Sequence, residues 1–311
     1  VTPRPGEPMS ATADATHFGG CKGTIRLEDC DFEGMGDDGV NIKSGCYLQF
    51  VRRVDDRTIV ATHNLGFVDV PDPGDMMEIS HVDDLIPYAT VTVVKAGQPK
   101  NKEVTVEFDR LPSELRESDV FGNATRVARA RFRRCRVANN RARGMLIQTR
   151  DAVVENCTFD HCSGPGVLVL TEVSFFFESI GTRDVVIRDN KFAGCNLGAG
   201  KSAGVLCAYA PLAGGAQPPK PGVHKNILFE GNSIDGSPNS GIYVAGVEGI
   251  TIRGNRIVNA CEAPDCDSGH AAIFVRSSSG IRVEDNEVDP AKQGRQFKTC
   301  LLYTSDAADE E

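Results

Sequence analysis

Short stretches in which apolar and polar residues alternate recur along most of the chain. They share the pattern apolar-x-apolar-x-x-(Asn or Cys)-x-apolar and occupy residues 25–32, 130–137, 153–159, 186–192, 228–234, 251–257 and 281–288. The Asn or Cys of each stretch is Cys30, Cys135, Cys157, Asn190, Asn232, Asn255 and Asn286. Successive spacings are 105, 22, 33, 42, 23 and 31 residues, so the shortest repeat is 22–23 residues and the excess is inserted sequence.

A second alternating run follows the first. In four units a glycine stands nine residues after the Asn or Cys and opens a Gly-apolar-x-apolar run, at Gly39, Gly144, Gly166 and Gly241. Alternation with a period of two indicates β-strands. Several short strands in each repeat predict an all-β chain that folds as a right-handed parallel β-helix, a solenoid of the pectin-lyase type. A leucine-rich repeat would need a Leu-x-Leu core and a longer helical half, which the sequence lacks.

The alternation also predicts which side chains face the solenoid core. The inward set is Val40, Ile42, Met145, Ile147, Val167, Val169, Ile242 and Val244. The outward set is Asn41, Lys43, Gln148, Tyr243 and Arg276. Asn at the repeated position suits the hydrogen bonding of backbone groups at a turn, and Cys there suits the filling of a small apolar space.

The repeat disappears between residues 46 and 122. This segment holds five strand-like runs and a sharp turn at residues 71–74. We therefore predict β-helix coils at 1–45, an inserted small all-β subdomain, of β-barrel type with five strands, at 46–122, and further β-helix coils at 123–299. At this place the insertion could wall one end of a groove, act as a spacer or form the contact of a homodimer.

The two ends of the chain look cut. The sequence CLLYTSDAADE near the C-terminus resembles a translated sequencing adapter, so we expect residues 300–311 to be a non-native tail and exclude them from the fold prediction. The first residues, VTPRPGEPMS, do not resemble a signal peptide, and we expect a secreted or periplasmic protein whose native N-terminal part is missing.

The net charge and the hydropathy of the chain argue against nucleic acid as a partner and against a membrane-spanning segment. Leaving out the four acidic residues of the tail changes the formal net charge from −9 to −5. A mildly acidic chain is a poor partner for nucleic acid. The longest apolar runs fall short of the roughly 18 residues of a transmembrane helix, so we expect no membrane span.

The chain has eleven cysteines; three occupy the repeated Asn or Cys position (Cys30, Cys135 and Cys157), and two lie five residues past it (Cys162 and Cys195). This placement predicts buried structural thiols. Cys261 and Cys266 share one loop and could form a local disulfide in an oxidising compartment. No cysteine spacing is typical of a zinc site, and we expect neither a metal nor another cofactor.

Candidate chemistry begins with two adjacent aspartates, Asp37 and Asp38, in the stretch GMGDDGVNIKSG at the start of a predicted strand. Asp14 stands 23 residues before Asp37, one coil earlier, so stacking should bring it within about 5 Å. Like charges at this distance raise the pKa of one carboxyl, and glycosidases obtain an acid and a base in this way. We predict Asp14, Asp37 and Asp38 as catalytic residues; the alternative is a solvated Asp-rich turn.

Further polar side chains could line the same face and bind a substrate. They are His17, Asn41, Lys43, Arg143, Gln148, Arg150, Glu172 and Glu178. The stretch FFFES at residues 175–179 offers an apolar wall for a sugar ring, with Glu178 as a hydrogen-bond partner. The alternative is a loop that folds onto the side of the solenoid.

Four stretches carry a family resemblance: DATHF, CKGTIRLEDCDFEGMGDDGVNI, RARGMLIQTRDAVVENCTFDHCSGPGVLV and FFFESIGTRDVVIRDNKF. Together they resemble glycoside hydrolase family 110, the α-1,3-galactosidases that remove terminal galactose. The resemblance implies inverting, single-displacement hydrolysis of a glycan without a metal. It places the essential aspartates at Asp37 and Asp38, with Asp14 one coil before. The chain departs from the family pattern at Lys43 and Ser44, where a His is expected, and at Phe176 or Phe177, where a Trp is expected.

Two other interpretations stay open. The stretch GDDGVNIKSG also resembles the Asp-Asp motif of family 28 polygalacturonases, although the Asn-Thr-Asp, Gly-His-Gly and Arg-Ile-Lys motifs of that family are missing. An acidic chain is moreover poorly suited to polygalacturonate. In a non-catalytic carbohydrate-binding β-helix, Asp37 and Asp38 would be turn residues, and replacing them would leave binding and stability nearly unchanged.

Overall fold

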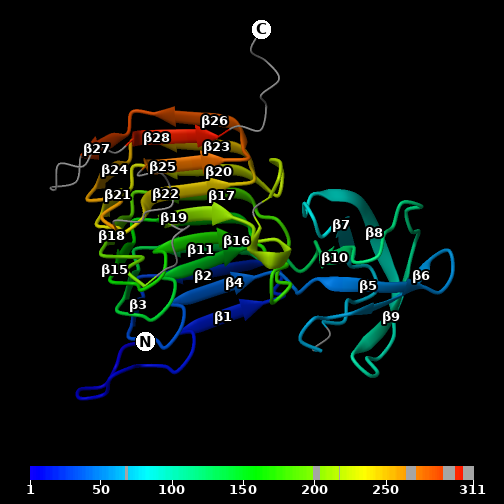
Figure 1. The fold of residues 1–311 in the computed structure, drawn as a ribbon. Helices are drawn as coiled ribbons and strands as arrows, with labels where there is room; N and C mark the ends of the chain where they lie inside the picture. The colour runs from blue at the N-terminus through cyan, green and yellow to red at the C-terminus, as the bar shows by residue number, and fades with distance from the viewer. Residues whose placement is uncertain (67–68, 199–203, 217, 264–270, 290–297, 304–311) are drawn as a thin grey trace, which may run out of the picture.

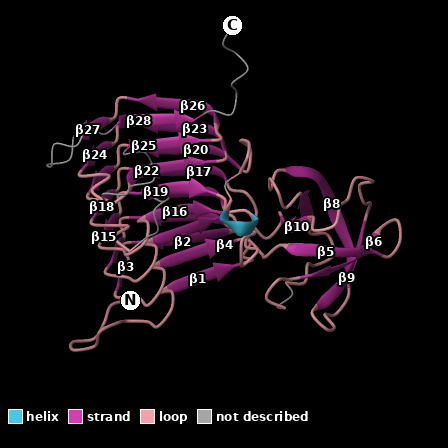
Figure 2. Cartoon of the chain, in the orientation of Figure 1, coloured by secondary structure: helices cyan, strands magenta, loops and turns pink. Residues whose placement is uncertain are grey.

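The computed structural model describes residues 1–66, 69–198, 204–216, 218–263 and 271–289, and the backbone of residues 298–303. Regular structure in these residues is almost entirely β-strand, as Figure 2 shows. One short 3₁₀ turn, η1 (Ala213–Gly215), interrupts it. Among the described residues there is no helix long and apolar enough to cross a bilayer.

Three parallel sheets run along a right-handed solenoid (Figure 1). The first contains β1 (Thr16–Gly19), β4 (Val40–Lys43), β13 (Met145–Gln148), β16 (Val167–Leu170), β19 (Gly204–Tyr209), β22 (Ser240–Ala245), β25 (Ala271–Arg276) and β28 (Lys298–Tyr303). The second contains β2 (Thr24–Glu28), β11 (Arg129–Arg133), β14 (Arg150–Glu155), β17 (Arg183–Arg188), β20 (His224–Glu230), β23 (Val247–Arg253) and β26 (Ser279–Glu284). The third contains β3 (Asp31–Glu33), β12 (Arg136–Ala138), β15 (Thr158–Asp160), β18 (Lys191–Ala193), β21 (Ser233–Asp235), β24 (Arg256–Val258) and β27 (Glu287–Asp289). This is the parallel β-helix that the repeat predicts.

The last described strand lies beyond the predicted end of the solenoid. β28 pairs in parallel with β25, and Cys300 lies opposite Ile273. The backbone of residues 300–303 thus continues the first sheet, and the non-native origin of residues 300–311 stays a prediction. An exposed strand edge presents unpaired N–H and C=O groups, and β28 satisfies those of β25.

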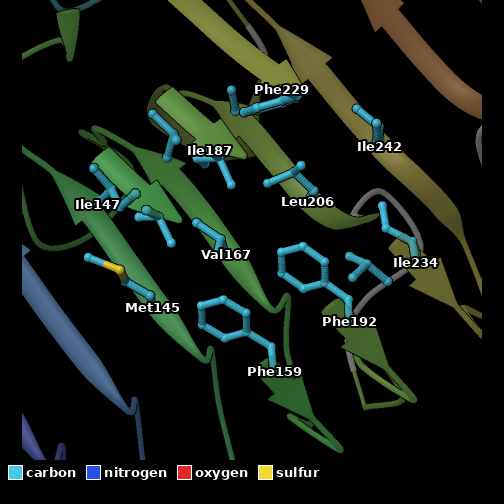
Figure 3. Packing of buried hydrophobic residues seen from close by; sticks show 14 of the residues in the cluster. Met145, Ile147, Phe159, Val167, Ile187, Phe192, Leu206, Phe229, Ile234 and Ile242 are labelled. Atoms are coloured by element: carbon cyan, nitrogen blue, oxygen red, sulfur yellow. The ribbon is translucent and has the colours of Figure 1, made fainter. Parts of the chain in front are cut away.

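The interior of the solenoid is a continuous apolar column. All eight side chains of the predicted inward set are buried in it, with at most 1% of their surface exposed. Figure 3 shows the rings of Phe159 and Phe192 side by side in this column, and their centroids lie 5.0 Å apart. Cys135, Cys157, Cys162 and Cys195 are buried in the same column, as predicted for structural thiols.

The outer face of the first sheet is less exposed than the alternation suggests. Asn41, Gln148 and Tyr243 do face away from the core, yet each exposes no more than 5% of its surface. Tyr243 packs in a second apolar cluster with Leu168 and other residues of this face. Periodicity identifies the face of a strand, whereas later coils and loops decide whether that face is covered.

The recurring glycine has a packing reason. A Cβ on Gly39 would lie 2.5 Å from the carbonyl oxygen of Gly144, and a Cβ on Gly144 would lie 2.5 Å from that of Gly166. Consecutive coils therefore approach so closely here that any side chain would collide with backbone.

Buried asparagines stack along the solenoid with their amides bonded in series. The Asn232 side-chain N–H group donates to the Ile187 carbonyl at 2.9 Å and to Asn255 Oδ1 at 3.0 Å. Its Oδ1 accepts from the backbone and side-chain N–H groups of Asn190, both at 3.1 Å. Each stacked Asn side chain thus hydrogen-bonds polar groups at the turn of a neighbouring coil, as the repeated Asn predicts.

Replacing Asn232 with Ala should destabilise the protein by roughly 3 kcal/mol, because it leaves buried N–H and C=O groups of two neighbouring coils unpaired. Denaturant unfolding followed by circular dichroism measures the change. Asn286→Ala, at a partly exposed rung of the same ladder, is the matched control and should cost clearly less. Equal losses of unfolding free energy in the two variants would show that burial does not set the cost of removing the Asn side chain.

The insertion is a closed six-stranded antiparallel barrel (Figure 1). Its strands are β5 (Leu48–Arg53), β6 (Thr58–Thr62), β7 (Met76–Ser80), β8 (Pro87–Ala96), β9 (Glu103–Phe108) and β10 (Val120–Asn123). The sequence predicts only five strands, at 46–122. The sixth, β10, pairs with both β5 and β7 and so closes the barrel.

The barrel is firmly docked on the solenoid. Glu78 of the barrel binds Arg150 of the solenoid in a two-pronged ion pair, at 2.9 and 2.7 Å, and also Arg183 at 3.3 Å. An apolar cluster joins Tyr47 to Ile180 and further residues of both bodies. The wall that the barrel presents to the solenoid is therefore fixed by both ionic and apolar contacts.

Candidate active site

Three carboxylates converge where the chain enters β1 and β4. Asp14 precedes β1, and Asp37 and Asp38 precede β4. One oxygen of each lies within 4.8 Å of the others. β1 and β4 pair in parallel with an offset of 24 residues, so Asp14 lies opposite Asp38 instead of Asp37. The predicted cluster forms, with a register one residue longer than the 23 that the repeat gives.

Asp38 is the buried member of the cluster, with 1% of its surface exposed. Its two carboxylate oxygens accept hydrogen bonds from the backbone N–H group of Arg143 at 2.9 Å and from the Arg143 guanidinium at 2.8 Å. Arg143 lies one coil further along the solenoid, as the alignment of Gly39 with Gly144 predicts. Its guanidinium contacts a catalytic candidate while 34% of the side chain is exposed, and its role in substrate binding stays a prediction.

Burial raises the pKa of Asp38 from 3.8 to about 7. The Arg143 guanidinium and backbone N–H group oppose this shift, and the charges of Asp14 and Asp37 add to it. A carboxyl with such a pKa exchanges its proton near neutral pH, which is what acid–base catalysis requires.

Asp14 and Asp37 are the accessible members. Asp14 accepts hydrogen bonds from the Asp38 backbone N–H group at 3.0 Å and, through its other oxygen, pairs with His17 Nδ1 at 2.7 Å. The Asp37 carboxylate accepts no hydrogen bond from any other described residue, while its carbonyl oxygen accepts one from Asn140 at 3.0 Å. Asp37 is therefore the carboxyl most available to an incoming ligand.

The donor set of this cluster favours hydrogen bonding over metal ligation. Both oxygens of Asp38 and both oxygens of Asp14 already face protein N–H groups, and a guanidinium lies 2.8 Å from Asp38. A divalent cation would need these lone pairs and would meet the charge of Arg143. The N–H groups and the guanidinium thus compete with a metal ion for the oxygens of Asp14 and Asp38.

Lys43 and Glu178 form a second site at the other end of β4. Lys43 Nζ lies 2.6 Å from Glu178 Oε1, and each side chain is 15% exposed. Asn41 lies between the two ends of the strand, and its Oδ1 has no partner among the described residues. Gln148 lies beside Lys43 in the next coil, fully buried.

Two predicted substrate-binding residues have structural roles instead. Arg150 is engaged by Glu78 of the barrel. Glu172 accepts hydrogen bonds from the backbone N–H groups of Ser174 and Phe175 at 2.8 Å and of Phe176 at 2.5 Å. Its carboxylate thus shapes the predicted aromatic loop from within. Arg150 is thus engaged by the barrel and Glu172 by its own loop, and the solenoid period describes neither contact.

The aromatic loop forms one wall of a pocket between the solenoid and the barrel. The pocket has a volume of about 380 Å³, and Phe176, Leu65, His63, Asp69, Arg126 and Cys46 belong to its lining, together with Lys43 and Glu178. Phe175 and Phe176 are exposed by 58% and 47%, whereas Phe177 packs in the cluster that joins the barrel to the solenoid. Phe176 therefore lines the pocket as an apolar wall. Phe177 instead folds onto the side of the solenoid.

Sequence reasoning misses the barrel side of this pocket. His63, Leu65, Asp69 and Arg126 follow no repeat, and their approach to Lys43 depends on how the barrel docks. The one available signal is Gly45, next to the predicted boundary: a Cβ there would lie 2.4 Å from Asp69 Oδ2. A glycine at such a junction permits close contact with an inserted segment.

Arg143→Met should raise the pKa of Asp38 beyond about 7, because the opposing positive charge is lost. An opposite charge at this distance is typically worth 1–3 pKa units, so the limb of the pH–rate profile that reports Asp38 should move to higher pH by roughly 1 unit or more. Arg134→Met removes an arginine that pairs with exposed Asp29 and should leave the profile in place. A shift to lower pH, or equal shifts in both variants, would contradict the assignment.

Comparison with known proteins agrees with this fold. A family model described as right handed beta helix region matches residues 116–213. The chain is 29% identical to a protein named α-1,3-galactosidase B from Akkermansia muciniphila, over 92% of this chain and 36% of that protein. It is 32% identical to the protein of the same name from Phocaeicola vulgatus, over 80% and 45%. It is 30% identical to that from Parabacteroides distasonis, over 90% and 48%. The chain spans less than half the length of these curated relatives.

Proposed function

Since this chain is a relative of the proteins named α-1,3-galactosidase, we propose that it removes terminal α-linked galactose from a glycan by inverting hydrolysis. The observation that carries the proposal is the cluster of three carboxyls within 4.8 Å, one of which has a pKa of about 7. A solvated turn does not require a buried carboxyl held by an arginine. We further propose that the protein works outside the cytoplasm, where such glycans occur.

The cluster can supply both proton transfers of an inverting reaction. Closely spaced carboxyls titrate as a unit, and this unit retains a proton near neutral pH. Asp37, the accessible carboxyl without a protein partner, passes the proton to the departing glycosidic oxygen. Asp14, the other partly exposed carboxylate, accepts a proton from the water that attacks the anomeric carbon, and the bond to the leaving sugar breaks as the new C–O bond forms.

The spacing of the carboxyls bears on the stereochemistry. Inverting glycosidases usually separate their carboxyl groups by about 6.5–9.5 Å and retaining ones by about 5–5.5 Å. The 4.8 Å limit here joins one oxygen of each carboxyl and is not a separation between whole carboxyl groups. Support for inversion therefore comes from the family resemblance. Its test is to identify which anomer of galactose the enzyme releases first.

Sugar release from a substrate panel tests the function. The panel contains Galα1-3Gal, other α-galactosides and polygalacturonate, each incubated with the 311-residue protein after circular dichroism has verified its β-structure. Galactose from the α-1,3 substrate alone supports the proposal. Release from polygalacturonate would instead favour the family 28 interpretation. Binding of galactosides by the folded protein without release would favour a carbohydrate-binding β-helix.

A further inference from the structure

The pocket between solenoid and barrel lies away from the carboxyl cluster. Asp38 comes just before β4, and Lys43 is its last residue. Five residues of extended chain cover about 16 Å. This distance is greater than the length of a disaccharide, so a galactose at the carboxyls and the sugar attached to it leave the pocket unfilled.

The lining offers hydrogen-bonding groups without net charge. Lys43 pairs with Glu178 at 2.6 Å. Arg126 pairs with Asp69 of the lining at 3.3 Å and, outside the lining, with Asp72 at 2.9 Å and Asp75 at 3.0 Å. Each cation is thus balanced by an anion inside the pocket, which leaves carboxylate oxygens and N–H groups available to hydroxyls. An anionic sugar would have to displace one of these carboxylates, so the pocket favours a neutral one.

One face of the pocket is apolar and rigid. Phe176 and Leu65 are exposed by 47% and 51%. The Phe176 carbonyl oxygen lies 3.1 Å from His63 Nε2, and the Phe175 carbonyl oxygen accepts a hydrogen bond from Asn64. With Glu172 binding the N–H groups of the same loop, the aromatic wall is held in place before a ligand arrives, which reduces the entropy cost of binding.

A buried polar group of the lining lacks a partner. His63 is 3% exposed, and its Nδ1 makes no hydrogen bond to any described residue. An unpaired buried polar atom is costly, and in a native protein it calls for an explanation such as a functional role or a bound partner. The volume of about 380 Å³ lies within the range of about 300–1,000 Å³ that is usual for small-ligand pockets.

We propose that this pocket binds a neutral sugar two or more units beyond the galactose that is removed, and that the preferred substrate is a linear oligosaccharide longer than a disaccharide. The position of the galactose rests on the proposed function, whereas the chemistry of the pocket does not. Phe176 packs against the ring of the bound sugar, and the two ion pairs take its hydroxyls.

Binding to a catalytically inactive protein tests the length dependence. In an Asp37→Asn background, calorimetry compares Galα1-3Gal with a neutral linear tetrasaccharide that has the same terminal unit. The tetrasaccharide should bind at least tenfold more tightly, and adding Phe176→Ala should remove that gain. Val54→Ala, an exposed apolar truncation in the β5–β6 turn, is the control and should preserve it. Equal affinity for the two lengths, or a gain that Phe176→Ala does not change, would overturn the proposal.

Alkylation of Cys46 separates this proposal from the proposed function. Cys46 lines the pocket, and burial raises the pKa of its thiol, so the reaction with iodoacetamide is run at alkaline pH. The tetrasaccharide should slow alkylation of Cys46 severalfold relative to Cys21, a partly exposed thiol outside the pocket lining, and the disaccharide should not. If the tetrasaccharide protects Cys46 but no galactose is released, the proposed sugar-binding pocket is supported and the proposed hydrolysis is refuted. If galactose is released from the disaccharide but the tetrasaccharide does not protect Cys46, the proposed hydrolysis is supported and the proposed sugar-binding pocket is refuted.

Discussion

Replacing Asp37 with Asn is expected to lower galactose release by at least about a thousandfold without unfolding the protein. Asp37 is the accessible carboxyl of the cluster, and its side chain makes no hydrogen bond to other described residues. Asn keeps the size of the side chain but has no proton to give, so the loss should appear in kcat, with KM little changed. Initial rates on Galα1-3Gal measure the effect.

The same experiment distinguishes a catalytic residue from a turn residue. Asp29, a left-handed residue in a surface turn, is the matched control, since Asp29→Asn keeps the turn and only weakens an exposed ion pair with Arg134. We expect this variant to remain within about twofold of wild type, because exposed pairs contribute little. Comparable rates for Asp37→Asn and wild type would remove Asp37 from the mechanism.

Replacing Asp38 with Asn should abolish activity and, at the same time, stabilise the protein at alkaline pH. Burial raises the pKa of Asp38 from 3.8 to about 7, so the folded state binds its proton more tightly than the unfolded chain does. The stability that follows from this proton is fully present below about pH 4 and is lost as the pH rises through 7. An Asn side chain carries no charge at any pH and escapes that loss.

The size of this gain is limited by the pKa shift. A shift of about 3 units corresponds to at most roughly 4 kcal/mol above pH 7, and the loss of the Arg143 ion pair reduces it. Thermal unfolding of both proteins at pH 4.5 and pH 8.5 is the measurement. We expect the variant to gain several degrees relative to wild type at pH 8.5 and clearly less at pH 4.5, where the unfolded chain has only begun to lose its proton. A variant that is less stable at pH 8.5 would show that Asp38 is not held in its protonated form by burial.

Much of the solenoid could be predicted from the sequence because its repeat is geometric. Each coil places the same residue types at the same height, so inward positions such as Val40 and Met145 follow from alternation. Charges stack by the same rule: Arg133 lies between Glu28 and Glu155 on adjacent coils, and Arg188 follows Glu155. The repeat does not specify loop lengths, and for that reason the offset between β1 and β4 is 24 residues instead of 23.

The carboxyl cluster could likewise be predicted from the repeat, whereas the pocket could not. Asp14, Asp37, Asp38 and Arg143 belong to the solenoid, and stacking brings them together as the repeat predicts. The pocket depends on antiparallel pairing within the barrel and on its docking, which are long-range contacts without a period. The sequence therefore assigns no role to His63, and it predicts Arg150 as a substrate-binding residue although this side chain binds Glu78.

The most direct test of the central claim is a proton NMR time course of Galα1-3Gal hydrolysis with wild-type protein and Asp37→Asn. The anomer that appears before mutarotation reports the stereochemistry of the reaction. We expect wild-type protein to release β-galactose first and the variant to release none over the same period. The first appearance of α-galactose, or equal release by the two proteins, would contradict inverting hydrolysis by this carboxyl cluster.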